Sequence, residues 1–342
     1  MSRTINFGIV GCGVIGNTHA QAIQTVPEVA NLAAVCDIIP ERANEFAKKY
    51  GGVPYYSLDE MLQHPGLDAI NVCTPSGVHA ECVVAAANKG VNALCEKPMD
   101  ITHAKLDAIV AASRRVKVGC VFQRRVWDIT RKIKAAIDGG DLGKLFLATA
   151  DMKWYRSQEY YDSGDWRGTW ELDGGGALMN QGIHGADLLL YLMGPIKSVQ
   201  AYAATLTHKI DVEDTLVGII KFENGALGTL NVTTSAQPSR TMVHEIHGSR
   251  GTIGLGEQGV TIWNIDGKDV NPEAETTAPD GGASSDPANL WIDGHVRLVK
   301  DMAEAIRDDR DPVITPDVGR GAVDFVLALY EAAKTGKEVT LG

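Results

Sequence analysis

Short apolar runs alternate with segments of helical period through the first 122 residues. The runs that we interpret as buried strands are 5–10, 31–37, 52–56, 68–74, 91–96 and 116–122. The helical segments between them include 17–26, 40–50, 79–90 and 103–114. Strands that are almost continuously apolar and separated by helices indicate a parallel sheet with both faces covered. Residues 1–122 are therefore predicted to form a doubly wound α/β domain of the Rossmann type.

The pattern changes after residue 122. The first elements are a helix at 125–138, a strand at 144–154 and a glycine-led helix at 176–193. The strand runs that follow, with no helix between them, are 198–206, 214–222, 226–234, 241–247, 252–256 and 260–265. The last elements are a polar loop at 270–286 and helices at 287–308 and 317–335. Consecutive strands of this kind indicate an antiparallel or mixed sheet, so we expect an α+β domain over 123–342.

Composition and charge exclude several classes of protein. Hydrophobic residues make up 44% of the chain and charged residues 22%, which are ordinary globular values. The formal net charge is −11, which repels phosphate backbones and argues against a nucleic-acid partner. No apolar stretch reaches the roughly 20 residues of a membrane span, and MSRTINFGIV has no signal-peptide pattern. We expect a cytoplasmic protein with neither a membrane nor a nucleic-acid partner.

No metal-binding spacing is present. The six cysteines lie in the first 120 residues without a CxxC pair, at Cys12, Cys36, Cys73, Cys82, Cys95 and Cys120. We expect them to be reduced and buried, the alternative being redox sensitivity at the edge of a cofactor site. His244 and His247 are three apart on a predicted strand, so they face opposite sides. The sequence therefore predicts no metal site.

A glycine-rich turn directly follows the first predicted strand. Residues 11–16 read Gly-Cys-Gly-Val-Ile-Gly, and Asp37 ends the second strand 21 residues after Gly16. The glycines permit a tight turn and close approach of a pyrophosphate, and the carboxylate suits the ribose hydroxyls of NAD. NADP is the alternative, since Arg42 could pair with its phosphate. The predicted cofactor contacts here are Gly11, Cys12, Gly13, Val14, Ile15, Asp37, Ile38 and Arg42.

Two further groups point to proton chemistry. Glu96-Lys97-Pro98 lies at the carboxyl edge of the fifth strand, where Lys97 can hydrogen-bond a substrate hydroxyl and help to carry its proton. Asn180 and His184 lie at i and i+4 and project from one helix face. A histidine there can take a proton while hydride leaves the same carbon, whereas Asn180 can only hydrogen-bond. The alternatives are a solvated surface lysine and a satisfied core histidine.

These motifs together resemble the Gfo/Idh/MocA family of NAD(P)-dependent sugar and cyclitol oxidoreductases over nearly the whole chain. The motifs that carry the resemblance are residues 11–16, Asp37, Thr74-Pro75 with His79, Glu96-Lys97-Pro98 and GGGALMNQGIHGADLLLYLMG. The resemblance implies an open, predominantly antiparallel sheet in the second domain, which carries the substrate pocket and mediates dimers or tetramers. It also implies a Lys97-Pro98 peptide that is often cis and a catalytic His184. Many members carry Asp where this chain has Asn180.

The resemblance implies further contacts residue by residue. Those expected toward the cofactor are Thr74, Pro75, His79, Glu96, Lys97, Gln123, Trp166 and Arg167. Those expected toward the substrate are Lys97, Arg124, Tyr155, Asn180 and His184. For Trp166-Arg167 the alternative is an exposed aromatic-basic loop, and for Arg124 an ordinary basic helix start. Asp187 could orient His184, but packing is the favoured reading.

The expected function is an NAD-dependent dehydrogenase that oxidises a secondary hydroxyl of a sugar, sugar acid, nucleotide sugar or inositol. Lys97 and His184 would handle the proton, and the nicotinamide would take the hydride. Two alternatives remain open: an NAD-dependent glycosidase of the same family and a non-catalytic NAD-binding regulator. The expected partners are a carbohydrate or cyclitol substrate and further copies of the chain, as a homodimer or homotetramer.

Overall fold

The computed structural model describes residues 3–270 and 292–341. The predicted loop at 270–286 therefore lies almost wholly outside the described residues. The chain divides into two compact units, Met1–Gln123 with Ile292–Arg320, and Arg124–Trp291 with Gly321–Gly342. We call them the cofactor unit and the substrate unit, after the ligands that the sequence assigns to them.

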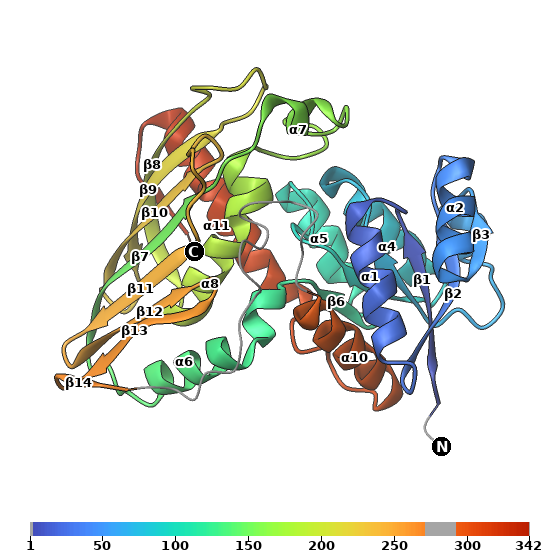
Figure 1. The fold of residues 1–342 in the computed structure, drawn as a ribbon, viewed down its shortest axis with the longest axis horizontal. Coiled ribbons are helices and arrows are strands. Elements are labelled where there is room, and N and C mark those ends of the chain that lie inside the picture. Colours follow the sequence, from blue (N-terminus) through green and yellow to red (C-terminus); the bar gives the residue numbers. More distant parts are fainter. Residues whose placement is uncertain (1–2, 271–291, 342) are drawn as a thin grey trace. The chain divides into compact units, whose positions relative to one another are not determined.

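The cofactor unit is built on a parallel sheet of six strands in the order β3-β2-β1-β4-β5-β6 (Figure 1). Its strands are β1 (Ile5–Val10), β2 (Ala30–Cys36), β3 (Val53–Tyr55), β4 (Ala69–Val72), β5 (Asn92–Cys95) and β6 (Val118–Cys120). Its helices before residue 123 are α1 (Val14–Thr25), α2 (Pro40–Tyr50), α3 (Leu58–Met61), the 3-10 turn η1 (Ser76–Val78), α4 (His79–Asn88) and α5 (His103–Ala112). The predicted doubly wound α/β domain is confirmed.

One helix belongs to a different unit from the one that the sequence assigns. Helix α10 (Asp293–Arg307) packs against α1, β1 and β5 and groups with the cofactor unit, not with residues 123–342. Right-handed crossovers place α1 on one face of the sheet and α4 with α5 on the other. The crossover helices therefore leave part of the α1 face uncovered, and the apolar side of α10 covers it. Sequence order does not reveal this return of the chain.

The substrate unit holds a sheet of nine strands in the order β14-β13-β12-β11-β7-β10-β9-β8-β15. The strands are β7 (Leu145–Lys153), β8 (Ile196–Ala204), β9 (Thr215–Phe222), β10 (Leu227–Thr233), β11 (Val243–Gly248), β12 (Gly251–Gly256), β13 (Gly259–Ile265), β14 (Lys268–Asp269) and β15 (Val339–Thr340). Among the described strands of this nine-stranded sheet, only β7 and β10 pair in parallel. The predominantly antiparallel sheet is confirmed. The remaining elements are the 3-10 turn η2 (Gln123–Val126), which starts at the end of the cofactor unit, α6 (Asp128–Asp138), α7 (Gln158–Asp162), the π-helix η3 (Ala177–Gly182), α8 (Ile183–Met193) and α11 (Pro316–Thr335).

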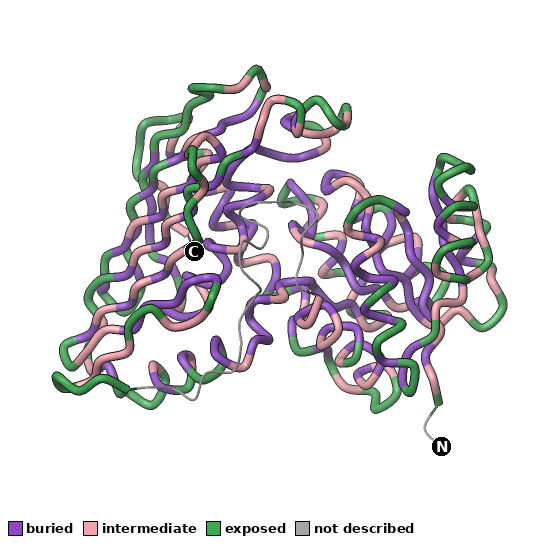
Figure 2. Tube along the Cα trace, in the orientation of Figure 1, coloured by how far each residue is buried: buried purple, intermediate pink, exposed green. Residues whose placement is uncertain are grey.

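The two faces of this sheet differ. Along β9, buried Leu216, Ile220 and Phe222 alternate with exposed Val217 and Ile219, and Figure 2 shows the same alternation along neighbouring strands. Elements η3 and α8 pack on the buried face, against β7, β9, β10 and β11. The opposite face carries apolar side chains that nothing in the described chain covers, and we call it the outer sheet face. Its members are Leu147, Tyr202, Val217, Ile219 and Leu227.

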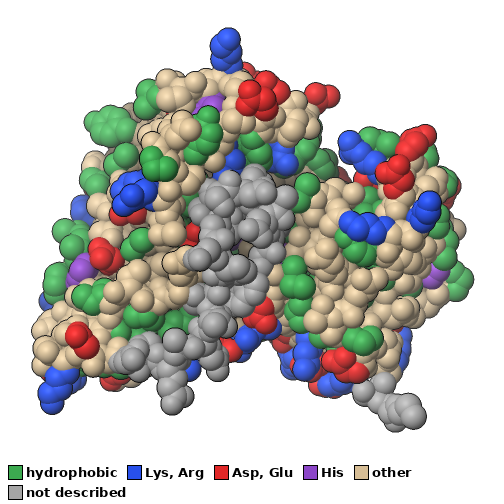
Figure 3. Space-filling view, viewed as in Figure 1, with side chains coloured by type: hydrophobic (Ala, Val, Ile, Leu, Met, Phe, Trp, Pro, Cys, Tyr) green, Lys and Arg blue, Asp and Glu red, His purple; other side chains and the backbone are tan. Residues whose placement is uncertain are grey.

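None of the described helices is long and apolar enough to cross a membrane. Basic and acidic side chains are interspersed over the face drawn in Figure 3, without a broad patch of one sign. All six cysteines are buried, and none of them forms a disulfide. Burial raises the pKa of the Cys12 thiol to about 12, so this thiol in the glycine-rich turn is a weak nucleophile, as the buried-filler reading expects.

Candidate active site

The glycine-rich turn has the geometry that the fingerprint requires. A Cβ on Gly11, whose φ is +96°, would lie 2.5 Å from the Cys73 carbonyl oxygen, and one on Gly16 would lie 2.3 Å from the Gly11 oxygen. At Gly13, in contrast, no described atom lies within 4 Å of such a Cβ. Helix α1 begins at Val14 without a side-chain cap on its first N–H groups. The turn thus leaves open space and backbone donors where a diphosphate would bind.

Asp37 is fixed beside this turn. Its Oδ2 accepts the Cys12 N–H at 3.0 Å and its Oδ1 accepts the Ile39 N–H at 2.9 Å, so the carboxylate is buried but oriented. Ile38 and Arg42 next to it are exposed. The buried amide oxygen of Gln123 has no hydrogen-bond partner in the described chain and is available to a donor of the cofactor. The residues present therefore fit a bound NAD.

His79 links two loops of the cofactor unit. Its Nδ1 lies 2.7 Å from the Pro98 carbonyl oxygen and its Nε2 lies 2.9 Å from the Thr74 carbonyl oxygen. The Lys97-Pro98 peptide is cis, as the resemblance implies. Because both ring nitrogens face backbone carbonyls, His79 holds the Thr74-Pro75 and Lys97-Pro98 loops together. This geometry favours a positioning role over the expected contact with the cofactor.

The Glu96 carboxylate turns into the interior of the cofactor unit. Asn71 Nδ2 donates to His19 Nδ1 at 2.9 Å, which places the ring proton on Nε2, and Nε2 donates to Glu96 Oε1 at 2.9 Å. His295 Nε2 lies 3.3 Å from the same oxygen, and Glu96 Oε2 accepts the Lys97 N–H at 3.0 Å. Burial alone would raise the pKa of Glu96, but the two imidazoles hold it well below its usual range.

This cluster was not foreseen from the sequence. His19, Glu96 and His295 each place one ligand-type atom within 4.8 Å of the others, all of them buried. Among the described residues, this is the group whose side chains lie close enough to hold a metal ion. It does not include His244 or His247, the pair that the sequence analysis considered as possible metal ligands. His19 takes part by hydrogen bonds to Glu96 and Asn71, whereas His295 only approaches Glu96 and has no hydrogen-bond partner at either ring nitrogen in the described chain. His19 follows the glycine-rich turn in sequence, but His295 is too distant for any spacing rule.

Lys97 and His184 are singled out by accessibility. Between Ala93 and Ile101, a stretch described throughout, Lys97 is the one residue that is not buried. Between Ala177 and Leu189, also described throughout, only Asn180 and His184 are not buried. In each segment, the side chains accessible to solvent are thus those that the sequence analysis predicts for the active site. This supports the prediction that Asn180 and His184 lie on one helix face.

The helix that carries Asn180 starts differently from the prediction. The sequence predicts one helix over 176–193, whereas the structure has the π-helix η3 followed by α8. Backbone N–H groups at the start of the π-helix bond to the Glu213 side chain, and the Asn180 N–H bonds to the Gly176 carbonyl oxygen at 3.0 Å. Wide turns of this kind occur frequently at functional sites. Asn180 Nδ2 donates to Asp173 Oδ1 at 2.7 Å, so its amide is oriented within the substrate unit.

Tyr160 joins the aromatic-basic loop to this helix. Arg167 lies over the Tyr160 and Trp166 rings, at 4.4 and 4.5 Å from their centroids. The Tyr160 hydroxyl accepts hydrogen bonds from Arg167 NH1 at 2.7 Å and from Gln181 Nε2 at 3.0 Å. Trp166-Arg167 is therefore an ordered part of the wall beside Asn180, which favours the functional reading over a loose exposed loop. Its contact with the cofactor stays a prediction.

Two arginines at the start of the substrate unit form internal ion pairs. Arg124 is buried and donates from Nη2 to Glu257 Oε1 at 3.1 Å, while its Nη1 has no hydrogen-bond partner in the described chain, so the substrate role that the resemblance implies stays a prediction. Arg125 bonds both oxygens of Asp187, at 2.6 to 2.9 Å. Asp187 therefore anchors Arg125, a role that neither reading of the sequence included. Tyr155 remains partly exposed, with its N–H bonded to Ser239 Oγ at 2.8 Å.

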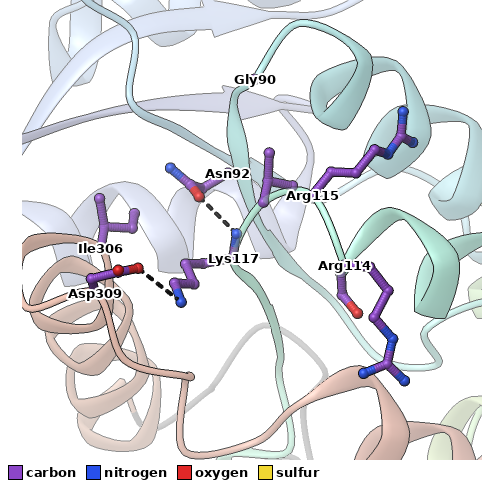
Figure 4. A pocket seen from close by; sticks show the side chains of 9 residues that line it. Gly90, Asn92, Arg114, Arg115, Lys117, Ile306 and Asp309 are labelled. Atoms are coloured by element: carbon purple, nitrogen blue, oxygen red, sulfur yellow. Dashed lines mark hydrogen bonds and ion pairs between the residues drawn. The ribbon is translucent and has the colours of Figure 1, made fainter.

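A surface hollow of about 340 Å³ lies elsewhere (Figure 4). Asn92 and Lys117 line it at the amino ends of β5 and β6, the opposite edge of the sheet from the glycine-rich turn. Its three basic side chains already have partners in the protein: Lys117 Nζ lies 3.1 Å from Asp309 Oδ1, Arg114 pairs with Asp317, and Arg115 donates to Asn88. Ligands of open α/β sheets bind at the carboxyl ends of the strands, so this hollow is not the candidate site.

The fold and these residues define an NAD-dependent oxidoreductase with a separate substrate domain. Residues 5–123 match the model of the oxidoreductase family with an NAD-binding Rossmann fold, and residues 130–254 match that of the GFO/IDH/MocA C-terminal domain. The chain belongs to the Gfo/Idh/MocA family, as its motifs predict, and it binds NAD.

Relatives of known activity span the whole chain. Scyllo-inositol 2-dehydrogenase (NAD(+)) of Bacillus subtilis is 27% identical over 359 aligned positions, covering 100% of this chain and 97% of that protein. D-glucoside 3-dehydrogenase of Escherichia coli is 28% identical, covering 99% and 98%. Among solved structures, the WlbA dehydrogenase of Bordetella pertussis in complex with NADH and UDP-GlcNAcA is 33% identical, with a TM-score of 0.88 and 99% of each chain covered. This chain is therefore an oxidoreductase of the sugar and inositol dehydrogenase kind.

Proposed function

We propose that this protein oxidises a ring secondary hydroxyl of a carbohydrate or cyclitol to a ketone, with Lys97 and His184 handling the proton. The observation that carries the proposal is accessibility. In two otherwise buried segments, the side chains left accessible are those that alcohol oxidation needs.

The chemistry requires removal of a hydride and a proton from one alcohol. Bound NAD supplies the hydride acceptor. Lys97 hydrogen-bonds the reacting hydroxyl and His184 receives its proton, and in the reverse direction the same two groups return it. Asn180, whose amide Asp173 orients, holds the hydroxyl but transfers no proton, since an amide does not ionise in this range. Since Lys97 and His184 belong to different units, the proposal requires both units to serve one substrate.

The substrate class follows from the relatives and from the polar wall of the substrate unit. Relatives act on scyllo-inositol and D-glucosides, and WlbA binds UDP-GlcNAcA, a nucleotide sugar with a carboxylate. Arg167 and Tyr160 beside Asn180 supply donors that suit a hydroxyl-rich or acidic ring. We propose a sugar, sugar acid, nucleotide sugar or inositol, with UDP-linked sugar acids the first compounds to test.

The experiment is a substrate panel followed by NADH absorbance. Scyllo-inositol, myo-inositol, methyl glucoside, glucuronate, UDP-GlcNAc and UDP-GlcNAcA are incubated with enzyme and NAD, and the matching ketones with NADH. Turnover with at least one is expected, and it should fall sharply in His184→Ala. Retained NAD, cleavage of a glycoside and no net NADH would instead identify the glycosidase alternative. Binding of NAD without any turnover would overturn the proposed function.

We also propose that the outer sheet face binds a second copy of this chain. Tyr202 is 85% exposed, Leu227 55% and Ile219 51%, on adjacent strands of one sheet. A contiguous apolar face of this kind marks an interface, and isologous dimers are the commonest closed assemblies.

We further propose that this protein is a cytoplasmic enzyme, because the six buried thiols of the chain suit a reducing compartment.

A further inference from the structure

The helix that carries Asn180 and His184 begins on two polar side chains from distant parts of the substrate unit. Glu213 lies just before β9, and Tyr330 lies on α11. Glu213 Oε2 accepts the Gly176 N–H at 2.9 Å, and Glu213 Oε1 accepts the Leu178 N–H at 2.8 Å. Tyr330 donates its hydroxyl to Glu213 Oε1 at 2.9 Å and accepts the Met179 N–H at 3.1 Å. We call this pair the Glu213–Tyr330 clamp.

The glycines before the helix fit this clamp. A Cβ on Gly176 would lie 1.8 Å from the Glu213 carbonyl oxygen, and one on Gly175 would lie 2.2 Å from the Tyr330 hydroxyl. The Glu213 carbonyl oxygen also accepts the Ala177 N–H at 2.9 Å. Three consecutive N–H groups that an ordinary helix start would leave unpaired, those of residues 176 to 178, are thus held by one residue. The clamp fixes the start of the helix from outside it.

We propose that Glu213 and Tyr330 are positioning residues for the proton-transfer side chains, because they set the turn from which Asn180 and His184 project. The inference rests on the proposed function of those two residues. It goes beyond it in placing part of the catalytic geometry in the segment before β9 and in α11, outside the helix that carries Asn180 and His184.

The electrostatics agree with a holding role. Glu213 is buried and Tyr330 is partly buried. Burial raises the pKa of Glu213 to about 7, while the hydrogen bonds from Leu178, Gly176 and Tyr330 act in the opposite direction. A buried carboxylate with this many neutral donors stays fixed, since any rotation would leave donors and acceptor unsatisfied. Asn180 lies two residues beyond the last N–H group that Glu213 accepts. A small shift of the turn therefore moves its amide directly.

The test uses Glu213→Gln and Tyr330→Phe in the full-length enzyme. Glu213→Gln keeps the size of the side chain but replaces one accepting oxygen with an NH2 group, which cannot accept the backbone N–H that it faces. Tyr330→Phe removes only the hydroxyl. Hydrogen exchange should speed up by roughly tenfold or more at the amides of 176–179. The kcat should fall about tenfold with little change in NAD affinity, because most of the predicted cofactor contacts lie in the cofactor unit.

The matched control is Asp214→Asn. Asp214 is the neighbouring buried carboxylate and accepts the N–H groups of Leu206, Thr207 and His208, not those of the helix start. It should leave exchange at 176–179 unchanged, and its kcat should fall less than in the clamp variants. Equal losses of kcat in Asp214→Asn and Tyr330→Phe would overturn the inference, and so would unchanged exchange in Tyr330→Phe. Faster exchange at 176–179 together with a fully active His184→Ala would instead contradict the proposed function and leave the clamp standing.

Discussion

Each unit buries a glutamate beside a candidate catalytic element, and folding shifts the pKa values of these two carboxyl groups in opposite directions. Glu96 in the cofactor unit faces the imidazoles of His19 and His295, and its pKa lies well below the usual range. Glu213 in the substrate unit faces only backbone N–H groups and the Tyr330 hydroxyl, and burial raises its pKa to about 7. Burial depth is alike, so the difference comes from the partners. A carboxylate next to groups that can carry positive charge stays ionised, whereas one next to neutral donors is protonated more easily.

The comparison also shows how each unit presents its reactive side chain. Glu96 accepts the N–H of Lys97, the residue that follows it, and Glu213 accepts N–H groups at the start of the helix that carries His184. In both cases the carboxyl group points inward and accepts backbone N–H groups, and the side chain proposed to carry the proton is not buried.

The largest effect is expected from the reactive side chains themselves. Lys97→Ala and His184→Ala should each lower kcat by roughly 10² or more, the range for loss of a positioned acid or base. NAD affinity should change little in His184→Ala and more in Lys97→Ala. Steady-state kinetics on the substrate found in the panel measure both. Asn180→Asp is the companion variant and should remain active. A folded His184→Ala enzyme with the parental rate from pH 6 to 9 would show that the substrate unit does not carry the proton.

The next largest effect concerns stability against pH. Because folding raises the pKa of Glu213 from 4.5 to about 7, its contribution is present below pH 4.5 and is lost as the pH rises through 7. At 1.36 kcal/mol per pKa unit this loss is about 3 kcal/mol. The stability of the parent relative to Glu213→Gln should therefore fall between pH 5 and pH 8 in urea unfolding.

Glu96→Gln should behave in the opposite way. Since folding lowers the pKa of Glu96, its contribution is present above pH 4.5 and is lost only as acid protonates the folded state. The parent should exceed Glu96→Gln by a constant margin from pH 6 to pH 8, and the margin should shrink below pH 4.5. A pH trend of the same sign for both variants would break the comparison between the two glutamates.

A smaller effect is expected on cofactor choice. Asp37→Ala removes an acceptor for the ribose hydroxyls and a charge that repels a 2′-phosphate. The ratio of NADP to NAD dissociation constants should fall about tenfold, as titration calorimetry can measure. Asp68→Ala, on the amino-edge side of the same sheet, is the matched control and should leave the ratio unchanged. Tighter binding of NADP than of NAD by the parent would contradict the role given to Asp37.

The outer sheet face should change assembly with little effect on chemistry. Ile219→Lys places a charge at its centre, opposite Gln200 and Thr229 on the flanking strands. Light scattering should show dissociation toward the 36.6 kDa monomer, whereas Lys221→Ala at the exposed end of the same strand should not. A parent that is monomeric at micromolar concentration would exclude this interface.

The smallest effect is expected from chelation. EDTA should leave kcat unchanged, because the proposed proton transfer uses side chains and both ring nitrogens of His19 already face protein partners, Glu96 and Asn71. Elemental analysis should find no stoichiometric metal. A bound divalent ion that is lost in His19→Gln would show instead that this cluster is a metal site.

The sequence by itself determined the cofactor half of this protein, since its evidence is local. A glycine turn after a strand, an acidic residue at the end of the next strand, and strands and helices in alternation follow from short-range sterics and periodicity. Lys97, Asn180 and His184 were predicted for the same reason, as each belongs to a short motif.

The tertiary structure alone decided what depends on distant partners. The return of α10 to the cofactor unit brings His295 to Glu96, 199 positions earlier in the chain, and α11 brings Tyr330 to Glu213. The ion pair of Arg124 with Glu257, 133 positions later in the chain, could not be read from the sequence either. The Glu213 side chain, which lies beyond that helix in the chain, accepts N–H groups at the start of a π-helix that the sequence did not predict. Periodicity records which face of an element is buried, but not which polar groups meet there, because that depends on chain paths that local forces do not fix.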